Sequence, residues 1–267
     1  MAVTLTHLEH ASAAAEADTP VLIAHGLFGS ARNFNSLGRR LATNRRVVQV
    51  DMRNHGDAPW AEAMDYPLMA EDLADAIDRL CGGRAVVLGH SMGGKAAMAL
   101  ALSQPDRVAA VLVADIAPIA HGNAHGGYIR AMGSLDLSLV RRRSDADPAL
   151  ADAVPDAGLR AFLLQNLRIE GGEARWRLNL RAIEAAMPDL IGWPGASPTD
   201  WPVAPYQGPA FFLRGSASDY VPLSTHPAIL RLFPGAEFDA LEGAGHWLHA
   251  EQPEAFFVAV SSWLHRI

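Results

Sequence analysis

The sequence has very little cysteine: Cys81 is the only one among 267 residues, which excludes an intramolecular disulfide. It also lacks any apolar run of about 18 residues, the length that a membrane-spanning helix needs. Its opening residues, MAVTLTHLEH, contain no basic segment followed by an apolar stretch, so we expect no secretory signal. These absences predict a soluble protein of a reducing compartment, and we expect it in the cytoplasm.

Positive charge is also scarce. The 22 Lys and Arg residues are outnumbered by 29 Asp and Glu residues, which gives a formal net charge of −7. Duplex nucleic acid and anionic membrane surfaces both require a dense basic face. We therefore expect neither nucleic acid nor a membrane as the main partner. A neutral or weakly charged small molecule fits this composition better.

Short apolar, β-branched runs alternate with amphipathic helical segments along most of the chain. This pattern is typical of an α/β fold with a mostly parallel central sheet flanked by helices. The predicted strands are residues 20–25, 46–51, 85–89, 108–115, 209–214 and 236–241. The predicted helices are residues 33–43, 66–80, 92–103, 225–233 and 253–266.

The alternation stops between residues 117 and 205. This stretch shows no convincing strand and has helical patterns at 125–143, 158–167 and 179–187. An insertion this long between two strands predicts a helical lid (cap) rather than a plain connection. We therefore expect a core of residues 1–116 and 206–267. Apolar lid residues that either line an acyl pocket or pack within the lid are Leu135, Leu139, Phe162, Leu163, Trp176 and Trp193.

The segment GHSMGGKA, starting at Gly89, fits two motifs that imply different proteins. It matches G-x-x-x-x-G-K, the beginning of a phosphate-binding P-loop, and also G-x-S-x-G, the nucleophile elbow. A P-loop needs Ser or Thr after the lysine to bind Mg²⁺, whereas this chain has Ala96. The elbow lacks nothing, because AVVLG predicts a strand, MGGKAAMALAL predicts a helix, and Ser91 lies on the turn between them. We therefore predict Ser91 as a nucleophile.

A serine hydroxyl needs a base to accept its proton. His246, in LEGAGHWLHAEQP, is the best candidate among 11 histidines because it follows the last predicted strand on a glycine-flanked loop. It also follows the nucleophile in the chain order Ser, acid, His of α/β hydrolases. His249, three residues later, could form a metal pair with His246. Two histidines three residues apart indicate a metal site only weakly when no carboxylate lies at helical spacing from them. We therefore predict no metal site.

Acyl transfer also needs backbone donors for the developing oxyanion. Met92 directly follows the nucleophile at a helix N-terminus, where unpaired amides favour negative charge. The second donor should come from HGLFGS, the loop after the first predicted strand. We predict the amide of Leu27 for this position, with Phe28 as the alternative.

The segments HGLFGS, DMRNHGDAP, GHSMGGKAAM, VADIAP and GAGHWLHAEQP together closely resemble the YbfF-like esterase branch of the α/β-hydrolase superfamily. The matches run from Val21 to the C-terminal helix. The resemblance implies an eight-stranded type of core with a helical lid, no cofactor, and hydrolysis of carboxylic ester or thioester groups.

The acidic partner of the histidine departs from the common superfamily pattern. Most members place it three residues after the glycine that ends the penultimate strand, and here that count from Gly215 reaches Ser218. Asp219 is one residue late. Asp115 instead ends the strand expected beside the one that carries Ser91, at the edge where ligands gather in such sheets. The resemblance favours Asp115 as well, because DIAP matches the segment that carries the acid in that branch. We predict Asp115, with Asp219 as the alternative acid.

These residues predict a serine hydrolase, a carboxylesterase or acyl thioesterase, that works through an acyl-enzyme on a small-molecule substrate. The same fold and residues also serve carbon–carbon bond hydrolases and acyltransferases. A ligand-binding receptor with a slow triad is the alternative outside enzymes.

Overall fold

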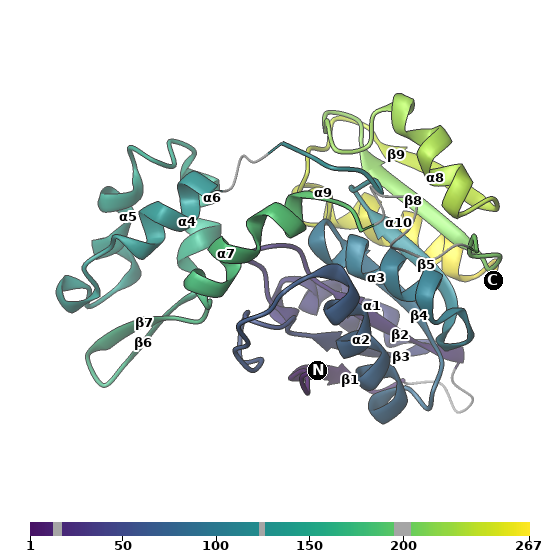
Figure 1. Ribbon diagram of the computed structural model, residues 1–267, viewed down its shortest axis with the longest axis horizontal. Coiled ribbons are helices and arrows are strands. Elements are labelled where there is room, and N and C mark those ends of the chain that lie inside the picture. The colour runs from purple at the N-terminus through teal and green to yellow at the C-terminus, as the bar shows by residue number, and fades with distance from the viewer. Residues whose placement is uncertain (13–17, 123–125, 195–203) are drawn as a thin grey trace.

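The computed structural model describes residues 1–12, 18–122, 126–194 and 204–267. Its core is a seven-stranded sheet in the order β1-β3-β2-β4-β5-β8-β9 (Figure 1). All neighbouring strands run parallel except β1, which is antiparallel to β3 at one edge. The strands of the sheet are β1 (His7–His10), β2 (Asp18–Ala24), β3 (Arg45–Val50), β4 (Ala85–His90), β5 (Val108–Ala114), β8 (Ala210–Gly215) and β9 (Ala236–Leu241).

Helices cover both faces of the sheet, because successive strand residues point to opposite sides. In β2, Leu22 packs into the cluster that contains α2 and α3, whereas Val21 and Ile23 pack into the cluster that contains α1 and α10. The α/β architecture with a mostly parallel sheet flanked by helices, predicted from the alternating pattern, is therefore confirmed. The larger helices of the core are α1 (Asn35–Leu41), α2 (Tyr66–Leu80), α3 (Met92–Ser103), α8 (His226–Leu232) and α10 (Pro253–Leu264).

Local sequence explains where these helices begin and what they bury. At the start of α2 the Asp65 carboxylate accepts a hydrogen bond from the amide of Leu68 at 2.8 Å, which satisfies one of the free donors of a helix N-terminus. Met69, Leu73 and Ile77 then follow at helical spacing and are fully buried against the sheet. The six predicted strands and five predicted helices of the core all lie within about two residues of observed elements.

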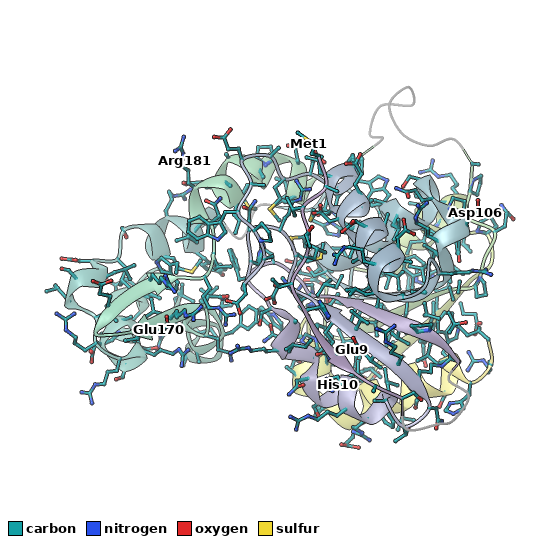
Figure 2. The ribbon with its side chains drawn as sticks, turned by 90° about the horizontal axis from the view of Figure 1, so that it is seen from below. Met1, Glu9, His10, Asp106, Glu170 and Arg181 are labelled. Carbon is teal, nitrogen blue, oxygen red and sulfur yellow. The ribbon has the colours of Figure 1, made fainter. Side chains whose placement is uncertain are left out.

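Between β5 and β8 the chain forms a separate group of elements, here called the inserted segment (residues 117–205). Figure 1 shows its helices and hairpin beside the sheet rather than in it. Arg181 and Glu170 of this segment are labelled in Figure 2, well apart from Glu9 and His10 on edge strand β1. Its described elements are α4 (Gly126–Gly133), η3 (Leu137–Leu139), α5 (Arg143–Leu150), α6 (Ala157–Leu164), β6 (Leu167–Glu170), β7 (Glu173–Trp176) and α7 (Leu180–Ile191).

Two predictions for the inserted segment were wrong. It does contain strands, because β6 and β7 pair as an antiparallel hairpin around Gly171 and Gly172, both at positive φ as a tight two-residue turn requires. The helix predicted for residues 125–143 is also broken, since α4 ends at Gly133 and α5 begins only at Arg143. His125 lies outside the described residues. The division of the chain at residues 117 and 205, and the lid itself, stay predictions.

The number of strands differs from the expectation. The resemblance implied eight strands, whereas the described residues form a seven-stranded sheet. Its edge strand β1 was not predicted. None of the helices in the described part of the chain is both long enough and apolar enough to cross a membrane. The remaining short helices are η1 (Ala31–Phe34), η2 (Pro105–Arg107), η4 (Leu223–Thr225) and α9 (Leu248–Glu251).

Candidate active site

Ser91 lies on the sharp turn between β4 and α3. Its backbone is strained, with φ 52° and ψ −119°, a conformation that non-glycine residues rarely adopt. The surrounding structure holds it there, since its amide donates to the carbonyl of Ala114 at 3.0 Å and its carbonyl accepts from the amide of Lys95 at 3.0 Å. The turn has the strand–turn–helix form of a nucleophile elbow.

The glycines on either side of Ser91 are required by close backbone contacts. A Cβ at Gly89 would lie 2.2 Å from the carbonyl oxygen of Gly93, and a Cβ at Gly93 would lie 2.4 Å from that of Ala24. Both distances are far shorter than a carbon–oxygen contact allows, and the obstructing atoms belong to the main chain. Only glycine therefore fits at these two positions in the present backbone.

The structure brings Ser91, His246 and Asp115 into one chain of hydrogen bonds. The Ser91 hydroxyl donates to Nε2 of His246 at 3.0 Å, and Nδ1 of His246 donates to Oδ2 of Asp115 at 2.7 Å. Because a carboxylate only accepts, Nδ1 carries the ring proton and Nε2 has its lone pair free for the serine. All three residues follow parallel strands at their carboxyl ends, where ligand sites of such sheets lie.

Asp115 is fully buried and is oriented from two sides. Its Oδ1 accepts a hydrogen bond from the amide of Gly215 at 3.0 Å, and the hydroxyl of Ser218 donates to its Oδ2. Its backbone has a positive φ of 53° directly after β5. Asp219, the alternative, is exposed, and no hydrogen bond joins it to His246 among those described. The carboxylate that meets the imidazole is thus the one at the end of β5.

The HGLFGS loop lies directly against the elbow. A Cβ at Gly26 would be 3.2 Å from the Cβ of Ser91, so the next residue, Leu27, starts beside the serine. His25 shapes the loop: its Nε2 accepts from the amide of Met52 at 2.9 Å, so its Nδ1 donates to the carbonyl of Gly26 at 2.8 Å. Burial lowers the pKa of His25, which therefore stays neutral at neutral pH.

Phe28, the alternative donor in the same loop, has a positive φ of 61°. Its carbonyl accepts a hydrogen bond from Nδ2 of Asn166 at 2.7 Å. Asn166 belongs to the inserted segment, so that segment contributes to the shape of the loop beside Ser91. No local sequence pattern predicts this contact, because the two residues are 138 positions apart.

A cavity of about 220 Å³ opens onto Ser91 and His246. Its walls come from both the core and the inserted segment, and they are largely apolar. Of the six apolar residues predicted either to line a pocket or to pack within the lid, Phe162 lines this cavity, whereas Leu163 is buried in the segment and Leu139 is exposed. The lining side chains that are apolar or aromatic include Leu27, Phe28, Phe34, Tyr128, Leu159, Phe162, Tyr220 and Trp247.

Tyr220 and His90 support His246 and were not predicted to do so. The ring of Tyr220 stacks on the imidazole of His246, with 3.9 Å between centroids and 22° between planes. Nε2 of His90 donates to the carbonyl of His246 at 2.8 Å, and burial pushes the pKa of His90 well below its usual value. His249 stacks on Phe34 with 4.4 Å between ring centroids, which explains this histidine by packing.

The remaining motifs have structural explanations. The lysine of the P-loop-like pattern, Lys95, is buried and donates to main-chain carbonyls of the inserted segment, so it does not project into a phosphate-binding loop. Within the described ranges, no group of three or more His, Cys, Asp or Glu side chains is arranged to hold a metal ion.

The chain is similar to known α/β hydrolases. A family model described as the alpha/beta hydrolase family matches residues 21–260. An sn-1-specific diacylglycerol lipase, ABHD11, from Mus musculus is 41% identical over 252 residues, which cover 91% of this chain and 80% of the relative. Esterase YbfF from Escherichia coli K12 is 35% identical, with 93% of this chain and 94% of that protein covered.

A solved structure of a marine microorganism esterase superposes with a TM-score of 0.91 and 34% identity, covering 98% of this chain and 99% of the other. The fold and the elbow thus define an α/β hydrolase. The chain belongs to the alpha/beta hydrolase family, and the resemblance to its YbfF-like esterases is confirmed.

Proposed function

We propose that this protein is a serine hydrolase that cleaves a carboxylic ester or acyl thioester through an acyl-enzyme on Ser91. The observation that carries the proposal is the pair of hydrogen bonds from Ser91 to His246 and from His246 to Asp115, at 3.0 and 2.7 Å. His246 removes the hydroxyl proton as Ser91 attacks the carbonyl carbon, then passes it to the leaving oxygen or sulfur. Asp115 orients the imidazole and stabilises its charged form.

Hydrolysis of the acyl-enzyme reuses the same groups. Water gives a proton to His246, attacks the acyl carbon and releases the carboxylic acid, after which the proton returns to Ser91. The main-chain amides of Met92 and Leu27 stabilise the oxyanion in both steps, Met92 from the N-terminus of α3 and Leu27 from the loop that packs on Ser91. Protein side chains, main-chain amides and water supply every group that acts on the substrate in these steps, so we propose no cofactor and no metal.

The substrate is a small molecule with an apolar part. The aromatic and aliphatic lining of the 220 Å³ cavity supports this, since such sites bind ligands mainly through apolar surface. The names of the relatives, an esterase and a diacylglycerol lipase, support an ester in particular. We propose that residues 117–205 form the lid over this cavity, as Tyr128, Leu159 and Phe162 belong to both. We also propose a cytoplasmic location, with which the single free and buried thiol of Cys81 agrees.

The test is replacement of Ser91 by Ala, with Ser103→Ala as the matched control. Ser103 ends α3 and its hydroxyl donates to the carbonyl of Ala99 at 2.8 Å, so it has no part in the site. Wild type and Ser103→Ala should hydrolyse p-nitrophenyl esters and acyl thioesters and bind a fluorophosphonate covalently, and Ser91→Ala should do neither. Turnover or labelling that survives in Ser91→Ala refutes the proposal. Ligand-induced stabilisation without turnover in wild type would favour a receptor instead.

A further inference from the structure

Lys95 is the only lysine in the whole sequence, and just 1% of its surface is exposed. It follows Ser91 by one turn of α3. A buried ammonium group loses its hydration and needs other partners to replace it. The mechanism proposed above does not use this residue, so the groups around its Nζ indicate what it does.

The partners of Nζ are carbonyls at the end of α7 in the inserted segment. Nζ donates to the carbonyl of Ile191 at 3.2 Å and to that of Gly192 at 2.5 Å. The last carbonyls of a helix lack donors within it and carry partial negative charge, which suits a cation. The ring of Tyr66 also lies 5.5 Å from Nζ. Because these groups replace water only in part, burial lowers the pKa of Lys95 to about 7.

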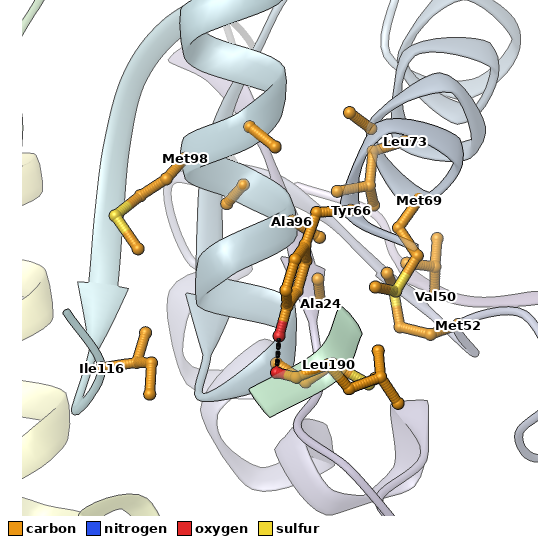
Figure 3. Packing of buried hydrophobic residues seen from close by; sticks show 14 of the residues in the cluster. Ala24, Val50, Met52, Tyr66, Met69, Leu73, Ala96, Met98, Ile116 and Leu190 are labelled. Carbon is orange, nitrogen blue, oxygen red and sulfur yellow. Dashed lines mark hydrogen bonds between the residues drawn. The ribbon is translucent and has the colours of Figure 1, made fainter. Parts of the chain in front are cut away.

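Tyr66 holds the same helix end. Its hydroxyl donates to the carbonyl of Leu190 at 2.5 Å, and Figure 3 shows this bond reaching from α2 across α3 to α7. The amide of His121 donates to the carbonyl of Ile191 at 2.8 Å. The three successive carbonyls of Leu190, Ile191 and Gly192 at the end of α7 therefore accept hydrogen bonds from Tyr66 and Lys95 of the core.

The anchored end of α7 forms one wall of a second, smaller cavity beside the nucleophile. This cavity has a volume of about 30 Å³, room for about one water- or methyl-sized group. It is lined by Ser91, Met92 and Leu27, which include both proposed oxyanion donors. Its other lining residues include Met187, Leu190 and Ile191 of α7, together with Tyr66 and Lys95.

The position of His246 decides which part of an ester enters each cavity. His246 lines the 220 Å³ cavity but does not line the small one. The leaving oxygen or sulfur must lie next to His246, because it receives the proton from Nε2. The alcohol or thiol part therefore lies in the large cavity, and the acyl chain points toward α7.

We propose that Lys95 and Tyr66 are positioning residues that hold the end of α7 against the core and thereby restrict the enzyme to short acyl groups. This inference rests on the proposed ester hydrolysis at Ser91. Neither side chain takes part in the bond changes. They act through Leu190 and Ile191, because the position of these two lining residues limits the space in the small cavity.

Two ester series test the proposal: p-nitrophenyl esters with acyl chains from acetyl to octanoyl, and acetate esters of alcohols of increasing length. In wild type, kcat/KM should fall as the acyl chain grows. Lys95→Met removes the donor and keeps the apolar stem, and it should raise the hexanoate-to-acetate ratio of kcat/KM about tenfold. Tyr66→Phe loses a single hydrogen bond and should raise it about threefold. The alcohol series should be unchanged in both.

Tyr206→Phe is the matched control. The Tyr206 hydroxyl donates to the carbonyl of Val108 at 3.1 Å, so this change also removes a buried tyrosine–carbonyl hydrogen bond, but one that does not involve α7. Tyr206→Phe should lower the melting temperature without changing the hexanoate-to-acetate ratio of kcat/KM. Equal acyl ratios in wild type, Tyr66→Phe and folded Lys95→Met overturn the proposal. A change in the alcohol series in place of the acyl series overturns it as well.

A second measurement does not depend on turnover. Because Lys95 is the only lysine, labelling by trinitrobenzenesulfonate at this residue, followed by peptide mass spectrometry, reports release of the α7 end. Labelling should be slow in wild type and Tyr206→Phe and several-fold faster in Tyr66→Phe. Equal rates of Lys95 labelling in wild type and Tyr66→Phe refute the anchoring of α7. A wild-type protein whose Ser91 does not react with a fluorophosphonate refutes the proposed hydrolysis instead. If Lys95→Met fails to fold, Tyr66→Phe decides both measurements.

Discussion

The hydroxyl of Ser218 donates a hydrogen bond to Oδ2 of Asp115, the same oxygen that accepts from His246. Ser218 occupies the position, three residues after Gly215, where most α/β hydrolases carry their acid. In this chain that position holds a donor, and the carboxylate comes from the end of the neighbouring strand β5. The end of β5 therefore supplies the carboxylate that binds His246, and the loop after β8 supplies the hydroxyl that binds the same carboxylate.

Ser218→Ala should weaken the orientation of Asp115 without removing it, because Gly215 still donates to Oδ1. A hydrogen bond to a charged group contributes about 1.5–3 kcal/mol, so we expect kcat/KM to fall by roughly tenfold or more. Steady-state kinetics with an acetate ester measure this. Ser216→Ala, two residues earlier, is the control, since the Ser216 hydroxyl accepts from the amide of Gly243 and does not contact Asp115. Similar losses in the two variants would contradict a specific role for Ser218.

Asp115→Asn should lower kcat by roughly three to four orders of magnitude, because an amide at this position favours the wrong tautomer of His246. Asp219→Asn should change kcat less than twofold, as the Asp219 side chain is exposed and is not joined to the imidazole. Measurement of kcat for both variants, with folding checked by circular dichroism, separates the two acids. A large loss in Asp219→Asn would reverse the assignment.

Gly93→Ala should destabilise the fold by roughly 2–4 kcal/mol, because the new Cβ would lie 2.4 Å from the main-chain oxygen of Ala24 and force the elbow to move. Gly127→Ala provides the opposite case within α4. A Cβ in this first turn of α4 meets nothing within 4 Å, and replacement of the glycine by alanine should stabilise by roughly 0.4–1 kcal/mol. Denaturant unfolding of both variants gives the two free energies. Equal changes in the free energy of unfolding would show that the backbone around Gly93 moves to accommodate the new Cβ at little cost.

Acid should destabilise the protein below about pH 6.5. Burial lowers the pKa of His55 to about 3 and that of His249 to about 4, so the folded protein binds fewer protons than the unfolded chain between these values and 6.5. The free energy of unfolding therefore falls as pH decreases, by about 1.4 kcal/mol per pH unit for each such histidine.

His55→Asn keeps a donor for the carbonyl of Arg53, which Nδ1 of His55 now binds at 2.9 Å, and removes the titrating ring. The slope of unfolding free energy against pH between about 6 and 4 should then decrease by about 1.4 kcal/mol per unit. Urea unfolding across this range measures the slope. An unchanged slope would mean that His55 is already charged in the folded protein.

The elements of the core could be predicted because their signals are local. Continuous apolar runs mark β4 and β5, and helical spacing of Met69, Leu73 and Ile77 marks α2. Paired glycines around Ser91 mark a turn with close backbone contacts. The hairpin β6–β7 and edge strand β1 were missed because their exposed faces carry polar and charged residues, so four-residue strands show little periodicity.

The sequence by itself determined that a serine would sit on a strained turn, that a histidine would follow the last strand, and that the protein would be an α/β hydrolase. The first two conclusions depend on backbone sterics and periodicity, which act over a few residues, and the third on short motifs that resemble those of the family. Only the tertiary structure decided which carboxylate meets His246, that Tyr220 stacks on its ring, and that Lys95 binds the end of α7. Such contacts join residues about 25 to 130 positions apart, and their geometry depends on how the strands and the inserted segment pack in space.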